Sequence, residues 1–312
     1  EGRLGGALVC AEGVDFKRRL KKFADHLALQ VKKAGVTVRL GCMATPEDIL
    51  AEQPDALILA EHYGDASDWL SGDQWDTVMN YDAFMEPVSW FLTGLEKHSE
   101  RKDEHLLHNS QAFMCSMLSN MSRMQTGSLY AAMNELSNHD HSRFLTRTNR
   151  VVGRLYKPED AENAEKGINY GTFRSGALIQ MTWPGAPTIY YGDEAGMEGF
   201  EDPLNRGTYP WGREDRDLLA WFTRLGALRN AYPALQSGTI SWLYTAGPLL
   251  IFARQDGDQR LTTAVNASPD SHTVTLLWEG AGPTDLLTGD TLPCSGGVLH
   301  LQLPPWGCRL LL

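Results

Sequence analysis

The sequence predicts an α/β protein whose parallel strands are followed by a small antiparallel β-sandwich. Over most of the 312-residue chain, short apolar runs alternate with long stretches of helical periodicity, which is typical of parallel strands joined by crossover helices. Beyond Leu235 the pattern changes to short alternating strands separated by turn residues, as in a sandwich. The chain is 42% hydrophobic, which is enough for a packed core.

The N-terminal part is predicted to run helix, strand, helix, strand. Apolar side chains recur at helical spacing over residues 15–34, and Gly35 ends this helix. Residues 36–40 follow as a strand, and residues 45–48 begin a capped short helix. Residues 56–60 then form an apolar run that is short enough to cross a sheet once.

The central part continues in the same style as far as Pro233, where we place a domain boundary. The predicted strands are 77–81, 128–135 and 187–191, and the predicted helices are 110–126, 171–181 and 215–232. The strands of the sandwich are expected in the segments LLIFARQ, RLTTAVNAS, HTVTLLW, VLHLQL and GCRLLL.

Composition and charge exclude several classes of partner. A net charge of -11 argues against nucleic acid and anionic membrane, because both require a basic footprint. No stretch approaches the roughly 18 apolar residues of a membrane span, and we find no secretory signal pattern. The cysteines show no CxxC spacing, so neither a disulfide framework nor a metal site is predicted: Cys10, Cys42, Cys115, Cys294 and Cys308. We expect a cytoplasmic protein that has no cofactor.

Acidic residues follow predicted strands at three places. These are Glu61 after 56–60, the pair His139–Asp140, and the pair Asp193–Glu194. The carboxyl ends of parallel strands converge on one face, so acids from separate strands can meet around one substrate. A strand-end ion pair is the alternative for Glu61, and a structural cap is the alternative for His139–Asp140. For Asp193–Glu194 we favour a structural role in shaping a loop.

Residues 57–312 resemble the C-terminal part of glycoside hydrolases of the α-amylase family (family 13), nearest to the neopullulanase, cyclomaltodextrinase and amylopullulanase types. The segment LILAEHYGDASDWLSGDQWDTVMNYDAF resembles the fifth and sixth barrel strands of that family. ELSNHDHSRFL resembles the seventh-strand motif, and TWPGAPTIYYGDEAGMEGFEDPLNR the eighth strand with its loop. The closing LPPWGCRLLL is similar to the last strand of the family's C-terminal sandwich.

The resemblance implies a role for individual residues. Glu61 stands at the position of the general acid/base, which protonates the glycosidic oxygen and later activates water. Asp140 stands at the carboxylate that favours the oxocarbenium-like transition state. The resemblance implies that these residues bind substrate: Asn138, His139, Asp202 and Arg206. The implied reaction is retaining hydrolysis of α-glucosidic bonds in maltooligosaccharides or pullulan.

The second catalytic carboxylate of the family is missing from the sequence. A retaining glycosidase needs a nucleophile about 5 Å from the acid, and the family supplies it from a Gly-x-Arg-x-Asp pattern on the fourth strand. The chain carries only GVTVRLG before Glu61. We therefore predict an incomplete, half TIM barrel with no nucleophile. Its open edge could be covered by the N-terminal helix or by another copy of the chain, or it could stay exposed and favour aggregation.

Residues 1–60 resemble a different family. The segment from Gly5 to Ala60 is similar to the nucleotide-binding region of NADH:flavin oxidoreductases of the old-yellow-enzyme and dienoyl-CoA reductase type. Its glycine-rich turn for a pyrophosphate is absent, and residues 2–6 are a weak echo of it. The predicted organisation is a chimera with three parts: 1–56 reductase-like, 57–234 half barrel and 235–312 sandwich.

Three functions remain open at this stage. The first is a glycosidase that is crippled by its missing nucleophile. The second is a carbohydrate-binding remnant whose binding survives loss of the acid, and the third is a flavin-linked oxidoreductase. Four aromatic residues could stack on sugar rings or belong to core and loop packing: Trp69, Trp183, Tyr209 and Trp211.

Overall fold

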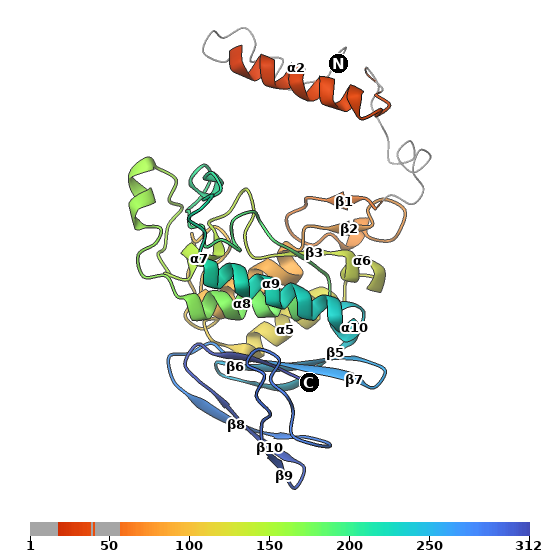
Figure 1. Cartoon of the computed structure of the whole chain (residues 1–312), viewed down its shortest axis with the longest axis vertical. Helices are drawn as coiled ribbons and strands as arrows, with labels where there is room; N and C mark the ends of the chain where they lie inside the picture. The colour runs from red at the N-terminus through yellow and green to blue at the C-terminus, as the bar shows by residue number, and fades with distance from the viewer. Residues whose placement is uncertain (1–17, 39, 41–56) are drawn as a thin grey trace. The chain divides into compact units, whose positions relative to one another are not determined.

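The computed structural model describes residues 18–38, 40 and 57–312. The chain divides into two units, Glu1–Ala56 and Leu57–Leu312, and each is described by itself (Figure 1). The predicted helix at 45–48, residue 56 of the predicted strand 56–60, and the glycine-rich echo at 2–6 lie outside the described residues.

The described part of the first unit is one helix and the residues that follow it. Helix α2 spans Arg18–Lys33, which confirms the predicted helix over its described length. It ends at Gly35, whose φ of +71° suits glycine. The strand predicted at 36–40 is wrong for the residues described, because Val36, Val38 and Leu40 are exposed and belong to no ladder.

Four short parallel strands form the incomplete barrel of the second unit. They are β1 (Leu59–Ala60), β2 (Thr77–Val78), β3 (Met133–Glu135) and β4 (Ala186–Thr188). β1 pairs with β2 and β3 pairs with β4, and a parallel bridge between Met79 and Met133 joins the two pairs. The order β1-β2-β3-β4 confirms the predicted run of parallel strands; the first three are labelled in Figure 1.

Helices cover this sheet and connect its strands. The α-helices are α4 (Glu86–Thr93), α5 (Ser110–Met121), α6 (Thr126–Ala131), α7 (Phe144–Arg147), α8 (Tyr170–Thr182), α9 (Arg216–Ala231) and α10 (Pro233–Gln236). Short turns of other types are η3 (Ser67–Trp69), the π-helix η4 (Tyr81–Met85), η5 (Pro158–Asn163) and η6 (Leu204–Arg206). Side chains cap the N-termini of three α-helices. Asn109, Asn169 and Asp215 each accept a hydrogen bond from an amide in the first turn of α5, α8 and α9.

Several predicted boundaries are corrected by the structure. The first half of the strand predicted at 128–135 is helix α6, and the helix predicted at 110–126 ends at Met121. The strand predicted at 77–81 gives way to η4 at Tyr81. A short apolar run such as SLYAAM fits a buried strand and a buried helix equally well, so periodicity alone does not separate them.

The C-terminal residues form two antiparallel sheets, as predicted. One sheet has the order β11-β7-β6-β5 and the other β8-β10-β9. Their strands are β5 (Thr239–Ala246), β6 (Leu249–Asp256), β7 (Gln259–Asn266), β8 (His272–Leu277), β9 (Cys294–Ser295), β10 (Val298–Leu303) and β11 (Cys308–Leu311).

The four-stranded sheet is buried on both faces. Leu249 and Ile251 of β6 pack into the core between the two sheets, whereas Leu250 and Phe252 pack with the helices of the half barrel. Side chains alternate along a strand, so a strand that is covered on both sides is apolar at every position, as the run LLIFA is. The half barrel and the sandwich therefore share one sheet.

Arg254 fastens this sheet to the helices. Its guanidinium is fully buried and donates to the carbonyl oxygens of Thr182 at 2.7 Å, Leu235 at 3.1 Å and Gly238 at 2.8 Å. Thr182 is the last residue of α8, where backbone carbonyls lack helical partners and attract a cation. Burial lowers the pKa of Arg254 to about 10.

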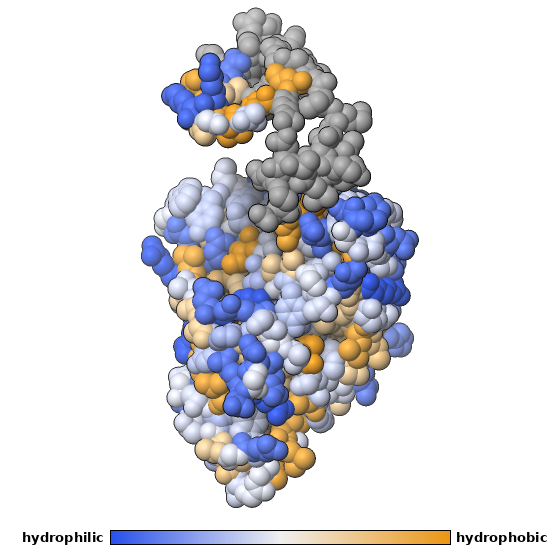
Figure 2. Space-filling model, turned by 90° about the vertical axis from the view of Figure 1, so that its right-hand side faces the viewer, coloured by the Kyte–Doolittle hydropathy of each residue, from blue (hydrophilic) through white to orange (hydrophobic). Residues whose placement is uncertain are grey.

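One face of the second unit mixes hydrophilic and hydrophobic residues (Figure 2). The face of the second unit shown in Figure 2 carries small apolar patches among polar residues. Of the cysteines within the described residues, Cys115, Cys294 and Cys308 are free thiols. None of the helices in the described residues is both long and apolar enough to cross a membrane.

Candidate active site

The carboxyl ends of β1 and β3 bring the predicted catalytic pair together. Glu61 follows β1 directly, and the turn after β3 carries His139 and Asp140. The imidazole Nε2 of His139 lies 3.4 Å from Glu61 Oε1 and 3.4 Å from Asp140 Oδ1. All three side chains are partly exposed, so they can meet a ligand from solvent.

Asp140 is held by a tyrosine and an arginine. The Tyr63 hydroxyl donates to Asp140 Oδ2 at 2.7 Å, and Arg206 Nη2 lies 3.6 Å from Oδ1. Burial and the bond to Asp140 raise the pKa of Tyr63 to about 12, so the phenol remains protonated and a donor near neutral pH. The Asp140 carboxylate is thereby fixed at two points.

The loop that contains η6 delivers the other two predicted residues. Arg206 Nε lies 2.9 Å from Asp202 Oδ1 and donates to the His139 carbonyl at 3.0 Å. The buried amide of Asn205 donates to three carbonyls of the β3 turn, those of Asn138, His139 and His141. Asp202 and Arg206 therefore lie beside Asp140, as the resemblance implies.

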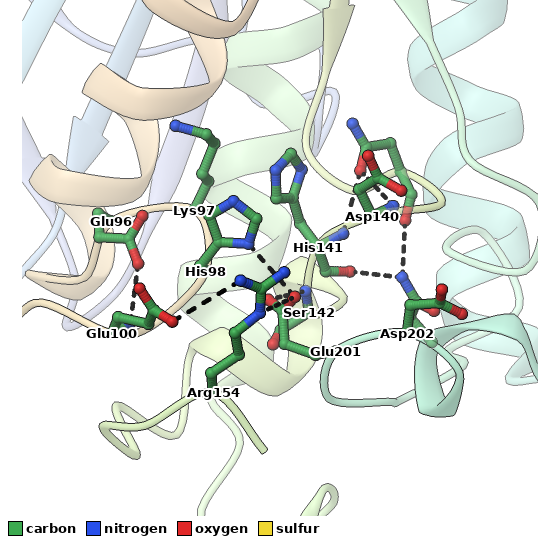
Figure 3. A network of polar contacts seen from close by, with 12 residues as sticks. Glu96, Lys97, His98, Glu100, Asp140, His141, Ser142, Arg154, Glu201 and Asp202 are labelled. Carbon is green, nitrogen blue, oxygen red and sulfur yellow. Dashed lines mark hydrogen bonds and ion pairs between the residues drawn. The ribbon is translucent and has the colours of Figure 1, made fainter. Parts of the chain in front are cut away.

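A buried carboxylate anchors the same loop from behind. Glu201 accepts from the Ser142 amide at 3.3 Å, and its Oε2 lies 3.2 Å from His98 Nδ1 and 3.4 Å from Arg154 Nε (Figure 3). His98 and Arg154 come from two other segments of the chain. This network fixes the residue next to Asp202 against the β3 turn.

Asn138 lies beneath the site. Its side chain is buried; Oδ1 accepts from the amides of Asp140 and His141, and Nδ2 donates to Tyr81 and Glu135. Both hydrogens of Nδ2 are thus used within the protein, and Oδ1 already accepts two bonds. The substrate contact that the resemblance implies for Asn138 stays a prediction.

Glu135 and Tyr81 form the buried floor of the site. Burial raises the pKa of the Glu135 carboxyl to about 8, against the lowering effect of its bond from Asn138. Burial also raises the pKa of Tyr81, helped by the negative charge of Glu135. The Tyr63 ring stacks on the Tyr81 ring, with centroids 4.8 Å apart and planes 10° from parallel.

His141 is fully buried beside this floor. Neither of its ring nitrogens has a hydrogen-bond partner among the described residues, and its ring lies edge-on to those of His98 and Tyr81, at 4.4 Å and 5.4 Å. Burial and neighbouring cationic groups lower the pKa of His141 to about 2. The imidazole is therefore neutral at any physiological pH.

Asp193 and Glu194 have the structural role that the sequence analysis favours. Asp193 pairs with Arg143 at 2.9 Å, and both side chains are buried. Glu194 accepts a bond from the Gly192 amide. The guanidinium of Arg143 also lies over the rings of Tyr190 and Tyr191. Together these contacts shape the turn after β4.

The four candidate aromatic residues separate into different environments. Trp183 is fully buried in the core, which excludes sugar stacking. Trp69 stacks on Trp75 with centroids 5.3 Å apart. Trp211 is 80% exposed, and its ring lies 4.5 Å from that of Tyr209.

One group of described residues has the donor set for a metal ion. Ligand atoms of Glu61, His139 and Asp140 lie within 4.8 Å of one another. Carboxylate and imidazole ligands of this kind suit several divalent metals, but the Arg206 guanidinium beside Asp140 opposes a cation there. These are also the predicted catalytic residues, so the cluster supports no separate metal centre.

Comparison with known proteins shows the family of the chain. The model of the alpha amylase catalytic domain matches residues 42–215, which is more than half of the chain. The chain belongs to the α-amylase family. The maltogenic amylase C-terminal domain matches residues 244–310, so the sandwich is the C-terminal domain of the same family.

Known α-amylase-family proteins match most of this chain. Neopullulanase 2 of Thermoactinomyces vulgaris is 35% identical over 265 residues, or 83% of this chain and 40% of that protein. Amylopullulanase of Thermoanaerobacter thermohydrosulfuricus is 32% identical over 271 residues, or 80% and 18%. A crystal structure of a debranching enzyme from Nostoc punctiforme matches with a TM-score of 0.70 and 27% identity, over 85% of this chain and 53% of that one.

The chain thus spans less than half the length of these curated relatives. The α-amylase-family match begins at residue 42, inside the segment that the sequence analysis assigns to a flavin oxidoreductase. None of the comparisons supports a flavin-oxidoreductase-like segment.

Sequence reasoning missed the residues that hold the α-amylase-family site in place. Glu201 and Asn205 are the direct neighbours of Asp202 and Arg206 in EDPLNR, and nothing in their spacing reveals their burial. Glu135 offers a usable signal, since it is a carboxylate inside a strand that the sequence predicts to be buried. Tyr63 and Tyr81 read as ordinary aromatic residues.

Proposed function

We propose that this chain supplies the acid/base half of an α-glucan hydrolase site. The observation that carries the proposal is the convergence of Glu61, His139 and Asp140 at the strand ends of an α-amylase-family half barrel. Glu61 is the general acid/base, and Asp140 stabilises positive charge on the sugar. His139, Asp202 and Arg206 bind sugar hydroxyls.

The chemistry follows the retaining double displacement. The Glu61 carboxyl protonates the glycosidic oxygen as a carboxylate nucleophile attacks the anomeric carbon, and Glu61 then removes a proton from the water that releases the sugar. The sequence shows no fourth-strand Asp for the first attack. We infer that a group other than the residues of this sequence must supply the nucleophile, and that α-glucans like those named for the relatives are the substrates.

An external nucleophile tests this function. We expect the purified chain to leave maltotriose and pullulan intact without azide, and to convert maltotriose to glucose and a maltosyl azide when azide is added, a reaction in which the leaving sugar must be protonated. Glu61→Gln should slow the azide-dependent reaction by roughly 10²- to 10⁴-fold, because general acid catalysis contributes that much. Product analysis by mass spectrometry checks it. Azide-independent turnover that Glu61→Gln abolishes would show that the chain has a nucleophile.

A carbohydrate-binding remnant is the second candidate. It is favoured by the polar, partly exposed arrangement of Asp140, Asp202 and Arg206, which is fixed independently of Glu61. In that case calorimetry detects maltooligosaccharide binding that survives Glu61→Gln and is lost in Asp140→Ala and Arg206→Ala. If azide-dependent cleavage is absent, this pattern of binding supports a carbohydrate-binding remnant, and the absence of binding rejects that function as well.

We further propose that a second copy of the chain covers the open barrel edge. Among the described residues, β1 and β4 each pair with one strand only, and Leu57, Leu59, Ile189 and Tyr191 beside them are exposed. Unpaired strand edges with apolar side chains favour association. Light scattering should give twice the chain mass at micromolar concentration and a monomer for Leu59→Lys; a monomeric wild-type chain contradicts the proposal.

A further inference from the structure

We propose that Tyr81 is a positioning residue that decides which oxygen of Glu61 carries the catalytic proton. The inference rests on the acid/base function proposed for Glu61. It adds a buried chain of hydrogen bonds, Glu135–Asn138–Tyr81–Glu61, whose donors and acceptors can be assigned from chemistry alone.

The direction of the chain is set by Asn138. Its Oδ1 faces two backbone amides, those of Asp140 at 3.0 Å and His141 at 3.2 Å. An amide N–H can only donate, so this atom must be the side-chain oxygen and the other must be Nδ2. Both hydrogens of Nδ2 are then used: one on Tyr81 Oη at 2.9 Å, the other on Glu135 Oε1 at 2.8 Å.

The Tyr81 hydroxyl accepts a hydrogen bond from Asn138 and donates one to Glu61. Because its oxygen accepts from Asn138, its hydrogen points elsewhere. Glu61 Oε1 lies 3.0 Å away. The other acceptors within reach, the Met79 thioether at 3.9 Å and the neutral Tyr63 hydroxyl, are weaker than a carboxyl oxygen. The Tyr81 hydroxyl therefore donates to Glu61 Oε1.

This bond leaves one oxygen of Glu61 for the proton. Oε1 accepts from Tyr81 and also lies 3.4 Å from His139 Nε2. A carboxyl oxygen that accepts a hydrogen bond is the carbonyl-like oxygen of the protonated acid, so the proton resides on Oε2. Tyr81 thereby presents Oε2 to the glycosidic oxygen, and the acid requires no rotation before it donates.

Packing prevents the Tyr81 hydroxyl from moving away. The side chain is 1% exposed, the Tyr63 ring covers one face at 4.8 Å, and His141 lies edge-on at 5.4 Å. Tyr81 is also the first residue of the π-helix η4, a backbone form that is frequent at functional sites.

Two substrates with different need of a proton provide the kinetic test. Cleavage of maltotriose to a maltosyl azide requires protonation of the leaving sugar, whereas α-maltosyl fluoride loses fluoride without it. We expect Tyr81→Phe to slow azide-dependent cleavage of maltotriose by ~10-fold or more, since a bond to an ionisable group is lost. The rate with the fluoride should stay within a factor of about 2. Equal losses on both substrates would indicate a merely structural role.

Tyr130→Phe is the matched control. The Tyr130 hydroxyl donates to the Gly238 carbonyl at 2.7 Å, so the variant also loses one tyrosine hydrogen bond, and this bond lies at the junction with the sandwich. Both reactions should proceed at wild-type rates in it. If the maltotriose reaction alone were slower in Tyr130→Phe, the effect of Tyr81→Phe could not be assigned to its bond with Glu61, and the proposal would fail.

Infrared spectroscopy separates this inference from the proposed function. At acid pH the carbonyl stretching band of the protonated Glu61 carboxyl can be assigned by its loss in Glu61→Gln, with no activity required. Tyr81→Phe should shift this band and Tyr130→Phe should not. An unshifted band overturns the hydrogen bond even if the chain is active. A shifted band in a chain that cleaves nothing retains the bond and rejects the acid/base function.

Discussion

Replacement of Asp193 by Asn is expected to lower the free energy of unfolding by about 1–3 kcal/mol at pH 7.5. The carboxylate of Asp193 is the acidic partner of the fully buried Arg143 guanidinium. Burial raises the pKa of Asp193 to about 6, so the ionised carboxylate carries a desolvation cost of its own, and the neutral Asn recovers that part of the cost. The variant leaves the arginine charge buried without its counter-ion, which is among the costliest of single changes. Urea unfolding followed by circular dichroism measures it.

Two further variants define this prediction. Asp258→Asn removes a carboxylate from an exposed position, and it should change stability by no more than about 0.5 kcal/mol. The double variant Arg143→Met with Asp193→Leu removes both charges, and it should recover much of the lost stability because a buried pair is often replaceable by apolar groups. A loss below about 1 kcal/mol in Asp193→Asn would contradict the account.

Glu135→Gln should make the protein less sensitive to alkaline pH. Burial raises the pKa of the Glu135 carboxyl from 4.5 to about 8 in the folded state. Between these values the unfolded chain has lost the proton and the folded chain still holds it, so wild-type stability falls as pH rises. The shift corresponds to about 5 kcal/mol at roughly 1.4 kcal/mol per pKa unit. Gln cannot ionise and can still accept from Asn138.

The stabilities of the wild type and Glu135→Gln should be compared between pH 6.5 and 8.5. Below this window, neutral His141 adds the opposite slope, because its pKa is lowered to about 2 and stability is lost as pH falls beneath 6.5. Denaturant unfolding of wild type and Glu135→Gln should diverge through the window, with the variant gaining relative stability until about pH 8. Parallel curves would mean that Glu135 is ionised in the folded protein.

Particular residues show how far the sequence predicts this molecule. Glu61 and Asp140 were predictable because each directly follows a strand, or the turn after one, and parallel strand ends converge. The sandwich was predictable because its alternation of apolar side chains is periodic. The segment 128–135 failed, since its apolar residues satisfy a helix as well as a strand and tertiary contacts decide between them.

The interior polar groups were beyond reach for a different reason. Asn205 contributes by donating to three carbonyls of a turn about 65 positions earlier in the chain, and no local pattern encodes such a pairing. Tyr81 likewise acquires its role from Glu61 and Asn138, which follow two other strands, β1 and β3. Local sequence specifies which groups are polar, and the three-dimensional fold specifies which of them meet.

The contacts of Arg254 limit how this protein can be recombined. The sequence pattern suggests a domain boundary near Pro233. Arg254, however, donates to the carbonyl of Thr182 before that boundary and to the carbonyl of Leu235 after it. If the sandwich were replaced by that of a relative without this arginine, the buried carbonyls at the helix ends would lose their hydrogen-bond donor. They would be left unpaired and shielded from water, which lowers stability. The two regions are therefore expected to be inherited together, as a single unit of exchange, although each matches a separate family description.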